Sequence, residues 1–225
     1  MTYAVTLSIL GIVLIAWAVS LAGWFWLLAW LGVNLVQLGI AHATGHHRPY
    51  AKQTDGTLPP WSKLWHLPFL LFTWLTWHLY RVTSREAAWD EISEDLVIGR
   101  RLLSHERPGD FANYVDLTTE FDELRPHRDS PGYLSFAVLD GSAPKPEVLF
   151  VSVKSLKPGR TFIHCAQGHG RTGLFALAVL LHQGKIKTIE EGLTLLRQKR
   201  PNVRLNAHQL KVAGQFLAQL KTPAG

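Results

Sequence analysis

Two side chains that could do chemistry on an anion stand in one short loop of the sequence. Cys165 is followed by five residues and then Arg171, within the run His-Cys-Ala-Gln-Gly-His-Gly-Arg-Thr-Gly at 164–173. Backbone N–H groups of a glycine-containing loop can surround an anion, and a guanidinium binds two phosphate oxygens at once. We therefore interpret Cys165 as a nucleophile that attacks phosphorus and Arg171 as the group that holds the phosphate.

The segment after the cysteine has the features that keep a thiol ionised. A helix is expected to begin near Arg171 or Thr172, with the positive end of its dipole beside the sulfur, where a cysteine ionises more readily than a free thiol. Glycines at 168, 170 and 173 permit the backbone conformations that such a loop needs. His164 is expected to order the loop by bonding to backbone, and the Thr172 hydroxyl to bond the departing sulfur. The predicted phosphate-binding loop comprises Ala166, Gln167, Gly168, His169 and Gly170.

Hydrolysis through sulfur also requires an acid for the leaving oxygen and then a base for the attacking water. Asp140 is the candidate, because it ends an apolar strand and begins the loop Asp-Gly-Ser-Ala-Pro, before the helix that precedes Cys165. An aspartate followed by glycine is also a common turn residue, and Asp129 is the alternative acid. Asp116 lies within an apolar strand, where a structural role beside the site is the better interpretation.

Cysteine and charge are unevenly distributed along the chain. Cys165 is the only cysteine, so no intramolecular disulfide can form. A lone cysteine is usually a buried structural residue, but the neighbours of Cys165 argue against that role. Residues 81–140 hold seven Lys and Arg against thirteen Asp and Glu, whereas residues 141–225 hold thirteen against three. The basic half suits an anionic substrate or membrane surface; nucleic acid is the generic alternative, but we find no nucleic-acid motif and expect no such partner.

Residues 1–41 predict a transmembrane helical hairpin. No Asp, Glu, Lys or Arg occurs from Tyr3 to Ala41, and these 39 residues suffice for two membrane spans of about 20 residues each. Ser, Ala and Gly at 20, 22 and 23 offer a turn, and Asn34 and Gln37 are expected to hydrogen-bond to the partner helix. A cleaved signal peptide is the alternative, but no basic residue precedes the apolar run, which continues well past the possible cleavage site at 16–18.

Residues 42–83 predict a linker followed by an aromatic, membrane-associated stretch. Residues 64–80 form an apolar run that contains Trp65, Trp74 and Trp77, and tryptophan is enriched at membrane–water boundaries. This run either spans the bilayer as a third helix or lies in its interface. Basic residues occur on both sides of it, so the positive-inside bias places both ends of the hairpin in the cytoplasm. The protein is then integral to the membrane, with its catalytic domain in a reducing compartment.

Residues 84–225 alternate strands and helices, which is typical of an α/β domain. Apolar runs at 95–98, 111–117, 133–139 and 161–164 predict strands, the last of which leads into Cys165. Segments at 146–156, 172–182, 189–199 and 207–220 predict helices. The expected fold is a mixed, mainly parallel sheet flanked by helices, preceded by the transmembrane hairpin.

The motif His164-Cys165, five residues, Arg171-Thr172 resembles the active-site motif of protein tyrosine phosphatases, and residues 89–217 resemble their compact dual-specificity branch. Residues 92–99 resemble the opening strand of that branch, 115–118 a central strand and 139–144 its general-acid loop; Arg200-Pro201, Asn206 and Gln209 resemble its C-terminal segment. The resemblance implies that Cys165 is the nucleophile, that Arg171 binds phosphate and that Asp140 is the acid, with no cofactor and no metal.

Three functions are compatible with these features. The main hypothesis is a membrane-anchored phosphatase for phosphotyrosine, phosphoserine or phosphothreonine in proteins. A phosphatase for phospholipids, such as phosphatidylglycerol phosphate or a phosphoinositide, is the alternative, because the hairpin would hold the site at the bilayer. An inactive phosphate-binding module is the third, although the three expected catalytic residues are all present. His42, His46 and His47 have a spacing that can bind metal on a helix, but interfacial histidines are the better interpretation.

Overall fold

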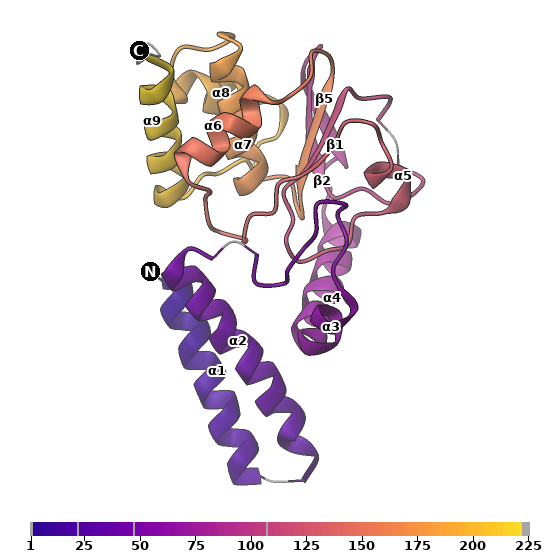
Figure 1. Ribbon diagram of the computed structural model, residues 1–225, viewed down its shortest axis with the longest axis vertical. Coiled ribbons are helices and arrows are strands. Elements are labelled where there is room, and N and C mark those ends of the chain that lie inside the picture. Colours follow the sequence, from indigo (N-terminus) through magenta and orange to yellow (C-terminus); the bar gives the residue numbers. More distant parts are fainter. Residues whose placement is uncertain (1, 22, 47, 107, 222–225) are drawn as a thin grey trace. The chain divides into compact units, whose positions relative to one another are not determined.

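The chain divides into two compact units in the structure, which is a computed structural model that describes residues 2–21, 23–46, 48–106 and 108–221 (Figure 1). The first unit comprises residues up to Gln53 together with Thr57–Ser84 and Thr119–Asp122. The second comprises Thr54–Gly56, Arg85–Thr118 and the residues from Glu123 onward. Each unit is described by itself below.

The first unit begins with two long helices, α1 (Thr2–Leu21) and α2 (Trp26–Thr44), joined through the short 3-10 helix η1 (Gly23–Phe25). Their backbones approach closely at glycines: a Cβ added to Gly11 would lie 2.5 Å from the Gly32 carbonyl oxygen, and one added to Gly32 would lie 2.6 Å from that of Gly11. Small residues at such a crossing let two helices pack in an apolar environment. Of the three predicted turn residues, Ala22 lies outside the described residues.

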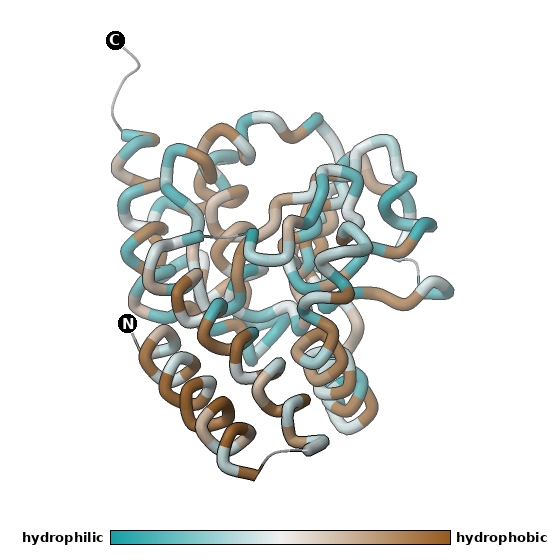
Figure 2. The backbone as a smooth tube through the Cα atoms, turned by 60° about the horizontal axis from the view of Figure 1, so that its bottom comes forward, coloured by the Kyte–Doolittle hydropathy of each residue, from teal (hydrophilic) through white to brown (hydrophobic). Residues whose placement is uncertain are grey.

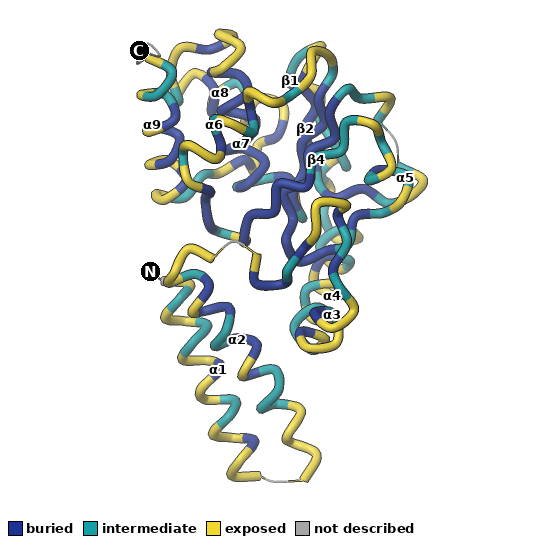
Figure 3. The backbone as a smooth tube through the Cα atoms, in the orientation of Figure 1, coloured by how far each residue is buried: buried dark blue, intermediate teal, exposed yellow. Residues whose placement is uncertain are grey.

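The outer surfaces of α1 and α2 are apolar and exposed (Figures 2 and 3). Among the described residues, Tyr3–Leu21 and Gly23–Thr44 are helical segments long and apolar enough to cross a membrane. Only 11% and 33% of their most apolar windows are buried, whereas the core helix of a soluble protein is mostly buried. By length, composition and exposure, the hairpin therefore fits a lipid environment.

The aromatic stretch at 64–80 is divided between two helices, α3 (Pro60–Trp65) and α4 (Leu67–Thr83). The break at His66 arises because Pro68 has no N–H and takes a place in the first turn of the new helix. Neither helix is among the segments long and apolar enough to span a membrane.

Polar side chains of α2 connect it to α3. The Asn34 amide donates to the Trp65 carbonyl at 3.2 Å, and the Trp65 indole donates to the Gln37 amide oxygen at 2.9 Å. We predicted that Asn34 and Gln37 would bond to the partner helix of the hairpin. Asn34 also donates to the Trp30 carbonyl of its own helix at 3.2 Å. The contact that both residues make outside α2 is with the end of α3, whose last carbonyl would otherwise lack an intrahelical donor.

The second unit is built on a five-stranded sheet of order β1-β2-β5-β3-β4. The β1–β2 pair is antiparallel, whereas β2–β5, β5–β3 and β3–β4 are parallel. The predicted mixed, mainly parallel sheet is therefore confirmed. The strands are β1 (Trp89–Ser93), β2 (Leu96–Arg100), β3 (Asn113–Asp116), β4 (Tyr133–Ser135) and β5 (Thr161–Cys165).

Helices cover both faces of this sheet. Alternate residues of β5 point to opposite sides: Ile163 belongs to the larger core cluster, together with side chains of α7, and Phe162 to a smaller cluster with Val97 and Tyr114. Figure 1 shows α6 to α9 gathered on one side of the strands and α5 on the other. The helices are α5 (Arg125–Arg128), α6 (Pro146–Lys154), α7 (Gly170–His182), α8 (Ile189–Lys199) and α9 (Ala207–Lys221).

Two predicted strands differ from the observed ones. Residues 92–99 form a hairpin, because β1 ends at Ser93 and β2 begins at Leu96. The strand predicted at 133–139 ends at Ser135. Beyond it, the N–H groups of Phe136 and Val138 donate to the carbonyls of Asp116 and Leu117. Residues 136–138 therefore run beside the end of β3 and lead to Asp140.

Candidate active site

Cys165 ends β5, the central strand of the sheet, and is followed by a loop that enters α7. In a parallel sheet the carboxyl ends of the strands are the usual place for a ligand. The side chain is nearly buried, at 4% exposure. The Gly168 N–H points back across the loop and donates to Cys165 Sγ at 3.2 Å. The loop thus curls around the sulfur, as the spacing of the motif predicted.

Gly168 is the glycine on which this curl depends. Its φ is +81°, and a Cβ there would lie 2.5 Å from the backbone carbonyl of Gly99 on β2. Gly170 and Gly173 were expected to serve the same purpose, but neither has a positive φ. They lie in the first turn of α7, and a Cβ on Gly173 would meet the Val203 side chain at 2.7 Å. Gly173 is therefore needed for packing and Gly168 for the loop conformation.

Arg171 is held in place from several directions. Its Nη1 donates to the carbonyl of Val138 at 2.9 Å, and its Nη2 lies 3.1 Å from Asp140 Oδ1. The guanidinium is buried, whereas 80% of the Asp140 side chain is exposed. The structure thus brings Arg171 and the predicted acid together in the absence of substrate.

The loop that carries Asp140 is tied to the beginning of α9. The Asn206 amide donates to the Gly141 carbonyl at 2.7 Å, and the Gln209 amide to the Ser142 carbonyl at 3.0 Å. The two side chains also accept from each other's backbone N–H groups, in the reciprocal manner of a capping box. Asn206 and Gln209, singled out above only by resemblance, therefore position the loop of the candidate acid.

The other two aspartates lie elsewhere. Asp129, the alternative acid, is at the end of α5, with its exposed carboxylate 3.8 Å from Arg128. Asp116 ends β3 and is fully buried; its Oδ1 accepts from the N–H and hydroxyl of Thr118, and its Oδ2 accepts from the Tyr133 hydroxyl at 2.9 Å. These contacts fit a structural role for Asp116.

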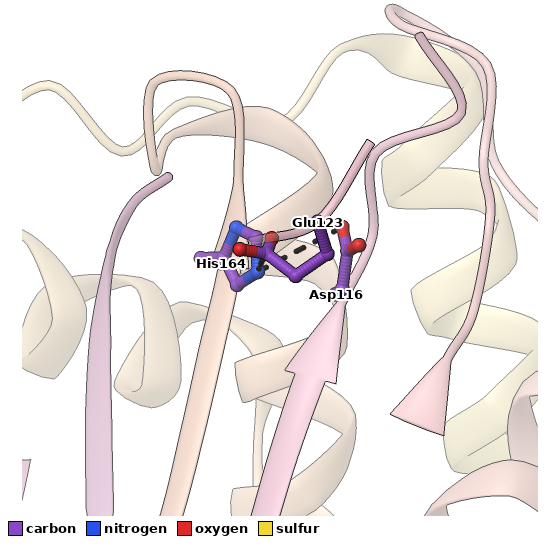
Figure 4. A group of neighbouring side chains, drawn as sticks. All are labelled: Asp116, Glu123 and His164. Atoms are coloured by element: carbon purple, nitrogen blue, oxygen red, sulfur yellow. Dashed lines mark ion pairs between the residues drawn. The ribbon is translucent and has the colours of Figure 1, made fainter. Parts of the chain in front are cut away.

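His164 lies between the loop and two buried carboxylates (Figure 4). Its Nδ1 is 3.3 Å from the Cys165 carbonyl oxygen. Its Nε2 is 3.2 Å from Glu123 Oε2 and 3.7 Å from Asp116 Oδ1. The backbone contact was expected from the sequence. Glu123 was not, because it is 41 positions from His164 (164 minus 123) in a segment without regular structure.

Among the described residues, Asp116, Glu123 and His164 also form a group that could surround a metal ion, because one oxygen or nitrogen atom of each lies within 4.8 Å of the others. Within this group, His164 Nε2 and Glu123 Oε2 are buried and have no hydrogen-bond partner among the described residues. His42 stacks on Tyr3 at 5.5 Å. His47, which belongs with His42 and His46 to the other candidate metal-binding group, lies outside the described residues.

Two tyrosines contribute to this buried cluster. Burial, together with the charges of Glu123 and Asp116, raises the pKa of Tyr114 well above its usual value. Burial and the adjacent Asp116 carboxylate raise the pKa of Tyr133 in the same way. Both phenols therefore stay protonated, which leaves Tyr133 able to donate to Asp116.

The Thr172 hydroxyl is buried and has no hydrogen-bond partner among the described residues, so the predicted bond to sulfur is not formed in this structure.

Arg200 supports the loop through its backbone. It is almost completely buried, and its Nε and Nη2 donate to the carbonyls of Gly168 and Gln167 at 3.0 and 2.9 Å. Its Nη1 pairs with Asp90 on β1 at 2.7 Å. A guanidinium bound to two loop carbonyls lets the loop N–H groups face the sulfur side, which is the arrangement that anion binding needs.

Glu86 reaches the middle of the loop. Its Oε2 is 2.7 Å from His169 Nε2, and its Oε1 accepts from the Asn202 amide at 2.8 Å. Partial burial raises the pKa of the Glu86 carboxyl, but the hydrogen bond from His169, the charge of Arg200 and the Asn202 amide outweigh this effect, so the pKa lies below its usual value. Nothing in the sequence indicated this contact, since Glu86 and His169 are 83 positions apart.

Solved structures of phosphatases share the architecture of this unit. The chain superposes on Tk-PTP in the active form with a TM-score of 0.52 and 22% identity, over 59% of this chain and 97% of that one. It superposes on PTPMT1 in complex with PI(5)P with a TM-score of 0.52 and 14% identity, over 62% and 100%. For human DUSP28 the values are 0.51 and 14%, over 61% and 97%. The fold is that of the dual-specificity phosphatases.

This likeness is one of fold, at 14–22% identity. The sequence matches no protein-family model and no curated protein. The same fold also occurs in a human protein described as a tyrosine phosphatase-like serine/threonine/tyrosine-interacting protein, at 12% identity and a TM-score of 0.51. The chemistry of the present chain is therefore argued from its own residues.

Proposed function

We propose that this protein is a membrane-anchored, cysteine-dependent phosphatase that hydrolyses phosphomonoesters through a phosphocysteine intermediate. The observation that carries the proposal is the convergence of a thiol and a guanidinium from one short segment with a carboxylate from another. Cys165 and Arg171 flank a loop that curls back on the sulfur, and the Asp140 carboxylate lies 3.1 Å from Arg171. A nucleophile, an anion clamp and an acid are the groups that this reaction requires.

In the first step, Arg171 and the loop N–H groups bind the phosphate, which replaces the Asp140 carboxylate on the guanidinium. The Cys165 thiolate forms a bond to phosphorus while the ester P–O bond breaks. Asp140, in its protonated form, gives its proton to the leaving oxygen, so the product alcohol or phenol departs neutral.

In the second step, the Asp140 carboxylate accepts a proton from a water molecule as the water oxygen bonds to phosphorus. The P–S bond breaks, and the products are inorganic phosphate and the Cys165 thiolate. The positively charged loop stabilises both transition states, because charge accumulates on the equatorial phosphoryl oxygens that it surrounds. No metal or cofactor enters either step.

Phosphotyrosine, phosphoserine and phosphothreonine residues of proteins are the substrates that we propose first. Support comes from the architecture shared with dual-specificity phosphatases such as human DUSP28 and from the exposed Asp140 side chain, which leaves the acid reachable for a protein-borne ester. A phospholipid phosphate is the second candidate. It is favoured by the exposed apolar helices α1 and α2 and by the likeness to PTPMT1, which was solved in complex with PI(5)P.

We further propose that α1 and α2 cross the membrane and that α3 and α4 lie against it, with the catalytic residues in the cytoplasm. The apolar, exposed surface of the hairpin supports the anchoring. The basic residues that follow α2, and those in the last turn of α4 and after it, support the orientation, because cytoplasmic loops are enriched in such residues. They include Arg48, Lys52, Lys63, Arg81 and Arg85.

Hydrolysis of an aryl phosphate by the full-length protein in detergent micelles tests this function. The wild type should turn over, and Cys165→Ser should have no measurable turnover while still binding inorganic phosphate. Activity of that variant equal to wild type would overturn the mechanism. Phosphopeptides and short-chain phospholipid phosphates, compared on the same preparation, separate the two substrate classes. A 100-fold ratio of kcat/KM, about 2.7 kcal/mol in transition-state binding, would decide between them.

A further inference from the structure

His169 and Arg200 are side chains at the phosphate-binding loop that contact carboxylates from outside the loop. His169 Nε2 lies 2.7 Å from Glu86, and Arg200 lies 2.7 Å from Asp90 and 3.6 Å from Glu86. Arg171, by contrast, pairs with the exposed Asp140, which a substrate phosphate can displace. The loop thus offers the charge of Arg171 to the substrate, whereas the single charge of Arg200 is shared by two carboxylates, Asp90 and Glu86.

Glu86 is the carboxylate that contacts the middle of the loop, through His169. It is held in position by two further contacts, the Asn202 amide on one oxygen and Arg200 on the other, and only 17% of its side chain is exposed. His169 lies near the middle of the loop, and 18% of its side chain is exposed. A second anionic group on the His169 side of the reacting phosphate would approach the negative charge of Glu86, which Arg200 offsets only in part because it also pairs with Asp90.

Given the proposed phosphatase function, we infer that Glu86 is a specificity-determining residue that favours esters with a single phosphate over esters with a second phosphate beside the first. Repulsion of the wrong substrate is a common way to obtain specificity. The effect falls on the second phosphate, because the reacting one is held by Arg171 and the loop N–H groups. A residue that only supported the loop would change the hydrolysis of both kinds of ester equally.

The test uses two peptides that differ in one group. Both carry a phosphotyrosine; in one, the neighbouring residue bears a non-hydrolysable phosphonate, so all phosphate released comes from the tyrosine. The readout is the ratio of kcat/KM for the two peptides, measured on the full-length protein in micelles. We expect the wild type to prefer the peptide without the phosphonate, and Glu86→Gln to reduce that preference about tenfold.

Further variants distinguish the charge of Glu86 at the loop from the net charge of the protein. His169→Gln keeps the Glu86 charge and should keep the preference, whereas the double variant should lose the preference as Glu86→Gln does. Glu91→Gln is the control, because this exposed carboxylate on β1 pairs with Arg160 instead of the loop, yet its loss changes the net charge equally. It should leave the ratio unaltered.

The possible outcomes separate the two proposals. A wild type that hydrolyses an aryl phosphate but shows equal kcat/KM for both peptides would overturn the inference about Glu86 and leave the phosphatase function standing. An unchanged ratio in Glu86→Gln would do the same. A wild type without activity toward any phosphomonoester would overturn the proposed function, and the inference with it. If Glu86→Gln fails to fold, the salt dependence of the wild-type ratio decides: added salt should reduce the preference, and a ratio independent of salt would overturn the inference.

Discussion

At the scale of single residues, the proposed mechanism requires the Asp140 carboxyl group to act first as a general acid and then as a general base. In the structure the Asp140 carboxylate pairs with Arg171, and 80% of the Asp140 side chain is exposed. During the reaction it must leave the guanidinium, give a proton to the leaving oxygen and later take one from water. Its position is set by backbone contacts of its own loop, which Asn206 and Gln209 hold.

Asp140→Asn tests this assignment. The amide keeps the shape but cannot donate or accept the proton, so kcat should fall by about 10²–10⁴ for substrates with poor leaving groups. The loss should be smaller for an aryl phosphate with an acidic phenol, which leaves without a proton. Steady-state kinetics over a series of substituted phenyl phosphates measures this difference. Wild-type rates across the whole series would transfer the role to another residue, and Asp129→Asn would then be compared.

Among residues, the sequence predicted those that are close to each other along the chain. Cys165 and Arg171 share one loop, so their spacing alone indicated the chemistry. Glu86, Glu123 and the function of Arg200 could not be predicted, because each meets the loop from a distant segment and carries no local pattern of its own. Their contacts depend on the pairing of strands such as β2 and β5, which only the folded sheet defines.

At the scale of elements, β5, the loop and α7 together place the sulfur beside the loop, where the Gly168 N–H donates to it. The loop fits against β2 only because residue 168 has no side chain. The predicted bounds of α8 agree with the structure, since the Thr188 hydroxyl caps its N-terminus and apolar spacing marks its length. The 92–99 hairpin was not resolved from sequence, because its two strands are separated only by Glu94 and Asp95.

Gly168→Ala should disrupt the loop that follows Cys165. The new Cβ would combine an unfavourable positive φ with a clash against the Gly99 backbone, so we expect both a lower melting temperature and a loss of at least tenfold in kcat/KM. Gly184→Ala is the matched control, because Gly184 also has a positive φ of +67° but its Cβ would meet nothing within 4 Å. Its cost should be about 1–2 kcal/mol of stability, with kcat/KM retained. Equal activity loss in the two variants would contradict the role given to Gly168.

At the scale of the entire protein, acidic groups link stability to pH. Glu106 forms a two-point ion pair with Arg100 and accepts from the Leu103 N–H. Partial burial raises the pKa of the Glu106 carboxyl, but these contacts outweigh it and the pKa is lowered. A carboxyl whose pKa is lower in the folded than in the unfolded state stabilises the fold above the unfolded pKa. That contribution is lost as pH falls through the folded pKa.

We therefore expect the melting temperature of the wild type to fall as the pH drops below about 4.5, because Glu86 and Glu106 take up protons more readily in the unfolded chain than in the folded one. Glu106→Gln should lower stability by about 1–2 kcal/mol at neutral pH and show a weaker dependence on acid. Thermal unfolding in micelles at a series of pH values measures both effects. Parallel curves for variant and wild type would show that Glu106 contributes nothing to the acid dependence.

The proposed mechanism requires that phosphate passes through the sulfur of Cys165. To observe this step, the Asp140→Asn protein is mixed with an activated aryl phosphate and quenched within the first turnover, and the added phosphoryl group is located by mass spectrometry of the peptides. We predict one phosphoryl group on the peptide that contains Cys165, and none when that cysteine is replaced by serine. A phosphoryl group on any other residue, or hydrolysis that continues in Cys165→Ser, would contradict the mechanism.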